Sequence, residues 1–144
     1  MIGIVVAAHE ALSRELLNAT SEIMSRRPQV EAVCFRRKDG PERLQRKMED
    51  SVRSADSGQG VLVLVDLYGG RPARVAMDLA LKHPGIEVVT GVHLPMLLEA
   101  VNHSGDYDLK ALAERITRKG REFIVNAREY RRKSRGSRKA PCKK

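Results

Sequence analysis

Short apolar runs alternate along the chain with segments in which apolar residues recur every three or four positions. The strongest run is Val61–Val65, which contains no polar residue. Runs of this length and composition are typical of parallel strands buried on both faces. We expect four strands, at about residues 2–7, 30–35, 61–65 and 86–89.

The segments between these runs carry the periodicity of amphipathic helices. Leu44, Met48 and Val52 repeat every four residues, which places them on one helix face. Pro41 and Pro72 suit a first helical turn, where a missing N–H is not lost from the helix. Apolar stripes of the same kind lie at residues 12–23, 75–80, 94–101 and 109–123.

Alternating strands and helices with short connections predict an α/β fold, doubly wound, with a mainly parallel sheet and helices on both faces. The most apolar run, the third, belongs in the centre, so we expect the strand order 2-1-3-4. In this order the chain winds in opposite directions from strands 1 and 3. A crevice therefore opens between the carboxyl ends of these two strands, where ligands bind in such folds.

The charge is concentrated at one end of the chain. The 144 residues fit one domain, with a formal net charge of +9. Residues 128–144 hold nine Lys or Arg and one Glu, a net charge of +8, which leaves 18 basic and 17 acidic residues in 1–127. We predict a domain at 1–127 and a basic, disordered tail at 128–144. Nucleic-acid binding is then expected only through the tail.

The composition, and the lack of a recognisable secretory leader, disfavour several classes of protein. Aromatic residues make up 3% of the chain, which disfavours a nucleic-acid module built on stacked rings. The two Cys are not grouped with other ligands, so we expect neither a metal site nor a cofactor. No secretory leader is recognisable and no apolar run approaches the ~20 residues of a membrane span. We expect a cytoplasmic protein.

His9 and Asp66 are the candidate reactive residues, because each directly follows one of the two central strands. The predicted topology places them on facing sides of the crevice. A carboxylate that accepts a proton from one ring nitrogen leaves the other nitrogen as acceptor and nucleophile. His9 as a simple strand end and Asp66 as a turn cap is the structural alternative; their shared position favours the chemical interpretation.

The turn after the third strand indicates an anion site. Gly69 and Gly70 allow a close backbone approach, the next helix begins at Arg71-Pro72, and helix starts favour anions. Arg71 adds a charge suited to a phosphoryl group. The turn matches neither a P-loop nor a dinucleotide fingerprint. A flavin is disfavoured because no aromatic residue is placed to sandwich its ring.

Several segments in this order carry a family resemblance: residues 2–9, 15–17, 60–70, 91–100 and 120–122. Over about residues 1–125 the chain resembles the enzyme IIA component of the mannose-type sugar phosphotransferase system. The resemblance implies that His9 takes a phosphoryl group from the histidine phosphocarrier protein and passes it to a IIB component, which phosphorylates a sugar. Asp66 would orient His9, and Gly69, Gly70 and Arg71 would hold the phosphoryl oxygens.

The resemblance also implies partners. Members of the family commonly form homodimers by exchanging a C-terminal strand, for which Phe123–Val125 is the candidate here. Association with a membrane would come through IIC and IID components. A regulatory phospho-acceptor of an incomplete system, or a polyanion-binding protein that acts through the tail, are the alternatives.

Three positions depart from the family pattern. Arg71 stands where the family usually has Ser or Thr, Arg74 where it often has Asn, and His93 where it has Asn. Two added cations would stabilise phosphohistidine and slow its onward transfer. Arg74, His93 and the nearby Tyr68 are therefore candidates for lining the site.

Overall fold

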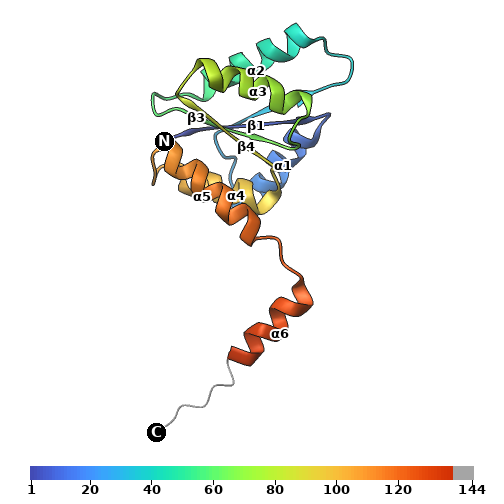
Figure 1. The fold of residues 1–144 in the computed structure, drawn as a ribbon, viewed down its shortest axis with the longest axis vertical. Coiled ribbons are helices and arrows are strands. Elements are labelled where there is room, and N and C mark those ends of the chain that lie inside the picture. Colours follow the sequence, from blue (N-terminus) through green and yellow to red (C-terminus); the bar gives the residue numbers. More distant parts are fainter. Residues whose placement is uncertain (138–144) are drawn as a thin grey trace.

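A four-stranded parallel sheet with the order β2-β1-β3-β4 forms the centre of the computed structural model, which describes residues 1–137 (Figure 1). The expected fold class and strand order are confirmed. The strands are β1 (Gly3–His9), β2 (Val30–Phe35), β3 (Val61–Val65) and β4 (Ile86–Thr90). The helices are α1 (Leu12–Met24), α2 (Pro41–Ala55), α3 (Arg71–Lys82), α4 (Leu94–His103), α5 (Leu109–Glu122) and α6 (Ala127–Ser137).

Helices cover both faces of the sheet, with α2 and α3 on one side and α1, α4 and α5 on the other (Figure 1). This explains why the strand sequences are continuously apolar. Val5 and Val63 pack into the core under α2 and α3, whereas Val6 and Leu64 pack into the core on the opposite face. All four are fully buried, and each buried aliphatic side chain contributes about 1.5–3 kcal/mol to stability.

The helix starts follow from local sequence. Pro lies in the first turn of α2, α3 and α4, where its missing N–H removes no helical hydrogen bond. α5 begins at a capping carboxylate: Asp108 accepts a hydrogen bond from the backbone N–H of Ala111 at 2.8 Å. None of the helices in residues 1–137 has the length and apolar character needed to cross a membrane.

The chain after α5 differs from the expectation of a disordered tail. Residues 127–137 form the helix α6, which extends away from the sheet and its helices (Figure 1). Arg, Lys and Glu are strong helix formers, and the Asn126 side chain accepts a hydrogen bond from the Glu129 N–H at 3.3 Å, as a helix cap does. The rest of the predicted tail, 138–144, lies outside the described residues.

The candidate exchange segment, Phe123–Val125, forms no strand in the single chain. Phe123 is the C-cap of α5, and Ile124 and Val125 are exposed. A strand needs a hydrogen-bonded neighbour, and within residues 1–137 the sheet consists of β1 to β4 alone.

Candidate active site

The carboxyl ends of β1 and β3 lie side by side and each leads into one polar residue. His9 is the last residue of β1, and Asp66 follows the last residue of β3. The register pairs Ala7 with Val65, so both side chains emerge at the same edge of the sheet. The structure thus brings together two residues that are 57 positions apart in the chain.

One carboxylate oxygen of Asp66 holds His9 at two points. Oδ2 lies 2.9 Å from the ring Nδ1 and also accepts the backbone N–H of His9 at 2.9 Å. Because a carboxylate oxygen accepts hydrogen bonds, Nδ1 carries the proton and Nε2 carries the lone pair. Asp66 Oδ1 is buried and receives no hydrogen bond from residues 1–137. The orientation of His9 therefore depends on a single oxygen.

The second ring nitrogen of His9, Nε2, is not buried. The His9 side chain is 40% exposed, whereas the Asp66 side chain is 13% exposed. Nε2 forms no hydrogen bond with any residue in the described part of the chain. A partly shielded carboxylate behind an exposed imidazole leaves Nε2 available as a nucleophile.

The two glycines of the following turn have different roles. Gly69 has φ +81°, a left-handed conformation that residues with a Cβ rarely adopt. Gly70 has an ordinary φ of −73°, but a Cβ there would lie 2.8 Å from Cε1 and 3.4 Å from Nε2 of His9. Gly69 is thus required by the backbone, and Gly70 by the space that the His9 ring occupies.

The N-terminus of α3 lies against the His9 ring and presents backbone donors. Gly70 is the N-cap, and its own N–H donates to the Leu67 carbonyl at 3.3 Å. The N–H groups of Gly69, Arg71 and Ala73 donate to no group within residues 1–137. Donors of this kind and the positive end of the helix dipole favour an anion next to His9.

Arg71 points toward the loop between β2 and α2. Its Nη1 donates to the Asp39 carbonyl and its Nη2 to the Arg36 carbonyl, both at 3.4 Å. This loop lies on the other side of His9, because Phe35 at the end of β2 pairs with His9 and accepts the Glu10 N–H. The guanidinium therefore connects the start of α3 to the loop.

A buried ion pair anchors this loop, and sequence reasoning did not identify it. The Asp39 carboxylate is 1% exposed and lies 2.6 Å from Lys47 Nζ of α2. The hydrogen bond from Lys47 holds the pKa of Asp39 below its ordinary value. The signal in the sequence was an acidic residue eight positions before a lysine, a spacing with no special meaning until the loop and helix are folded together.

Glu10 is the second residue of this region that the sequence did not single out. It follows His9 with φ +52°, and its carboxylate accepts the Arg37 N–H at 3.0 Å and lies 3.9 Å from Arg36. These contacts tie the residue after His9 to the β2–α2 loop. A positive φ cannot be read from a single Glu in the sequence.

The remaining candidates occupy different positions. Tyr68 is 83% exposed on the turn after β3, and Arg74 is exposed on α3. His93 is the N-cap of α4, and its two ring nitrogens are buried without a hydrogen bond to residues 1–137. The His93 ring lies beside Gly120 of α5: its Cε1 is 3.5 Å from where a Cβ on that glycine would be. It makes no hydrogen bond to His9 or Asp66.

Comparison with known proteins identifies relatives of this site. Residues 3–117 match the family model described as "PTS system fructose IIA component". The chain is 39% identical over 97 residues to "Putative phosphotransferase enzyme IIA component YadI" of Escherichia coli K12, covering 67% of this chain and 66% of that protein. It is 30% identical over 123 residues to "PTS system mannose-specific EIIAB component" of the same strain, covering 83% of this chain and 38% of the relative.

Solved structures share the fold. A phosphotransferase system component EIIA from Streptococcus agalactiae superimposes with a TM-score of 0.79 at 26% identity, covering 88% of this chain and 97% of that chain. A mannose/sorbose-specific IIA subunit from Enterococcus faecalis also gives 0.79, at 28% identity, covering 87% of this chain and 93% of that one.

Proposed function

Because the chain belongs to the family of fructose IIA components of the phosphotransferase system, we propose that it is a cytoplasmic phosphohistidine carrier. It accepts a phosphoryl group on His9 from the histidine phosphocarrier protein and passes it to a IIB component for sugar uptake. The observation that carries the proposal is the 2.9 Å contact between Asp66 Oδ2 and His9 Nδ1, which leaves the lone pair on Nε2 of a side chain that is 40% exposed.

The transfer is a substitution at phosphorus between two imidazoles. The lone pair of His9 Nε2 forms a new P–N bond while the P–N bond of the phosphorylated carrier breaks, and the electron pair leaves with the carrier ring. The His9 ring gains positive charge in this step, and its Nδ1–H remains bonded to Asp66. A carboxylate at this position stabilises the charge as it develops.

The start of α3 is the proposed cradle for the phosphoryl oxygens. Gly69 and Arg71 each offer a backbone N–H, and the absence of a side chain at Gly70 leaves space beside the ring. Pro72 has no N–H, so the next donor along the helix is the N–H of Ala73, which is the third of the set. The side chains of Arg71 and Arg74 add positive charge around this helix start. This charge stabilises the site when it holds a dianionic phosphoryl group.

The surface around His9 suits a protein partner. Leu67 is 60% and Tyr68 is 83% exposed beside the reactive ring. Exposed apolar side chains next to an accessible nucleophile favour transfer between protein surfaces over capture of a small molecule. We place the docking site of the phosphocarrier and of the IIB component here; IIC and IID components would provide any link to a membrane.

Homodimer formation is the remaining part of the proposal. Phe123, Ile124 and Val125 form a short apolar segment, of which Ile124 is 76% and Val125 is 52% exposed. Pairing of this segment with a second copy would bury these side chains and supply the neighbour that a strand requires.

Incubation with the phosphorylated phosphocarrier protein tests the proposal. Wild type and a His83→Ala control, which changes an exposed histidine at the end of α3, are expected to become labelled with an acid-labile phosphoryl group. His9→Ala is expected to remain unlabelled. Labelling of His9→Ala at the wild-type rate would remove His9 from the mechanism.

A second step distinguishes transport from regulation. Phosphorylated wild-type protein is mixed with a IIB protein, and the phosphoryl group is followed on both chains. Transfer to IIB is expected. A protein that is labelled on His9 but releases the group only to water would be a phospho-acceptor with a regulatory role.

A further inference from the structure

The helix α6 carries a stripe of arginines on one face. Its four arginines, Arg128, Arg131, Arg132 and Arg135, follow the spacing i, i+3, i+4, i+7, whereas Lys133 lies on another face. At 3.6 residues per turn these four side chains fall within an arc of about 100°. We name them the α6 arginine stripe.

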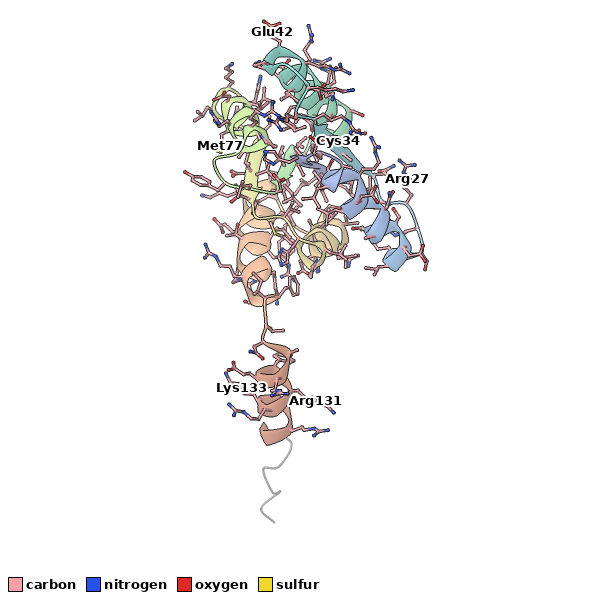
Figure 2. The ribbon with its side chains drawn as sticks, turned by 90° about the vertical axis from the view of Figure 1, so that its right-hand side faces the viewer. Arg27, Cys34, Glu42, Met77, Arg131 and Lys133 are labelled. Carbon is pink, nitrogen blue, oxygen red and sulfur yellow. The ribbon has the colours of Figure 1, made fainter. Side chains whose placement is uncertain are left out.

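The α6 arginine stripe is accessible and has no charge partner in the described part of the chain. All four residues are exposed, and none of them forms a salt bridge within residues 1–137. α6 stands apart from the sheet and its helices in both views, and Figure 2 shows Arg131 and Lys133 on this separate helix. The fold of the domain therefore does not explain the stripe.

We propose that the α6 arginine stripe binds the phosphate backbone of double-stranded nucleic acid, independently of the phosphoryl chemistry at His9. Arginine is the side chain best suited to this, because its planar guanidinium donates two parallel hydrogen bonds to a phosphate. From Arg128 to Arg135 the helix advances about 10.5 Å. That distance corresponds to about three steps between phosphates along one strand, hence about four phosphates, at 3.4 Å per step along the duplex axis.

The opposite face of α6 distinguishes nucleic acid from a membrane. It contains Tyr130, Lys133 and Ser134, and the Ser134 hydroxyl donates to the Tyr130 carbonyl at 2.7 Å. A helix that lies on a bilayer needs a broad apolar face to insert into the acyl boundary. The face of α6 opposite the stripe has a single aromatic residue, which is too little apolar surface to hold the helix on a bilayer.

The charge distribution of the whole chain supports a local binding element. Residues 1–127 are nearly neutral, with 18 basic and 17 acidic side chains, whereas residues 128–144 carry +8. Like charges at these helical spacings destabilise an isolated helix. Phosphates along the stripe would relieve this repulsion, so binding and helix stability are coupled.

Fluorescence anisotropy of the full chain with a labelled 20-base-pair duplex tests the proposal. If the stripe contacts four phosphates, the affinity falls about 150-fold between 50 and 200 mM salt, from a slope of about −3.6. Replacement of all four stripe arginines by Gln is expected to weaken binding at least 100-fold at 100 mM salt and to remove most of this slope. Gln keeps the helix propensity and removes only the charge.

Two further variants make the test specific. The first replaces the exposed Arg14, Arg26, Arg27 and Arg46 of the domain by Gln, which gives the same net charge; binding is expected to stay within threefold of wild type. The second combines Y130R, R131Y, S134R and R135S, which keeps the composition but distributes the arginines over both faces. It is expected to bind at least fivefold more weakly than wild type.

Several results would overturn the proposal. The first is a redistributed variant that binds the duplex as tightly as wild type. The second is a domain variant that loses as much affinity as the stripe variant. The third is a wild-type protein that binds phosphatidylserine vesicles or polyglutamate more tightly than duplex DNA or RNA. Labelling of His9 by the phosphocarrier is measured on the same variants. It is expected to be unchanged, which separates this proposal from the phosphohistidine function.

Discussion

The contact between Asp66 and His9 predicts how two substitutions of Asp66 affect phosphoryl acceptance. As Nε2 bonds to phosphorus, the ring becomes cationic, and its bond to the carboxylate at 2.9 Å changes from one with a neutral donor to one between charged groups. Only this strengthening lowers the barrier, because an interaction that is equal in both states does not accelerate the step. Asp66→Asn keeps an acceptor oxygen for Nδ1 but removes the charge.

The magnitude follows from the energies of the two kinds of hydrogen bond. Bonds to charged groups contribute about 1.5–3 kcal/mol and neutral ones about 0.5–1.5 kcal/mol. The loss of the charge therefore costs about 1–1.5 kcal/mol, or about 5- to 13-fold in rate. Asp66→Ala loses the same strengthening and also the acceptor that fixes the ring tautomer and orientation, so a cost of about 1.5–3 kcal/mol, or about 13- to 160-fold, is expected. The 40% exposure of His9 favours the lower part of each range.

Rapid-quench labelling by the phosphorylated carrier measures these rates in a single turnover. Asp78→Asn serves as the charge control, because Asp78 is an exposed residue of α3 without a salt bridge within residues 1–137. Urea unfolding corrects for stability, since Asp66 also accepts the His9 backbone N–H. A wild-type rate for Asp66→Asn, or faster labelling of Asp66→Ala than of Asp66→Asn, would refute this account of the ion pair.

Two other predictions concern the residues around the pair. Gly70→Ala places a methyl group against the His9 ring, so labelling should fall at least tenfold with little change in stability. Gly69→Ala instead strains a left-handed backbone and should lower the free energy of unfolding by about 1–2 kcal/mol, while the folded protein is still labelled. Thermal melts and the labelling assay compare the two variants; a loss of stability in Gly70→Ala with a loss of labelling in Gly69→Ala would contradict these roles. Asp39 has a pKa lowered below its ordinary 3.8 by Lys47, so its ion pair adds stability above that pH and loses it as pH falls through the folded pKa. Asp39→Asn should therefore be less stable than wild type in urea at pH 7, and this deficit should shrink as the pH falls below 3.8, whereas a deficit that does not change with pH would rule out the ion pair as the cause.

Much of the fold was accessible from the sequence because strong local patterns agreed with each other. Val61–Val65 is apolar without interruption, and the structure buries all five side chains between two helical layers. The strand order followed from placing this strand in the centre and from the handedness of the connections. The same topology predicts that His9 and Asp66 lie together, since adjacent parallel strands end at the same edge of the sheet.

Other features depend on contacts that a linear pattern does not contain. Arg71 contacts carbonyls of residues 36 and 39, more than 30 positions away, and the Asp39–Lys47 pair closes only when α2 packs beside β2. The sequence predicts the charge of Arg71 beside a phosphoryl group, but it does not contain the hydrogen bonds of the guanidinium to the β2–α2 loop. α6 was missed for a local reason: the high helix propensity of Arg, Lys and Glu, together with the Asn126 cap, outweighs the repulsion that predicted disorder.

The central claim is that Asp66 holds the Nδ1 proton of His9 and leaves Nε2 as the nucleophile. Nitrogen-15 NMR of the histidine side chains, recorded before and after phosphorylation by the carrier protein, tests it most directly. The account predicts that the unphosphorylated ring is protonated on Nδ1 and that the phosphoryl group appears on Nε2 of His9. A phosphoryl group on Nδ1 of His9, or on any other histidine, would contradict it.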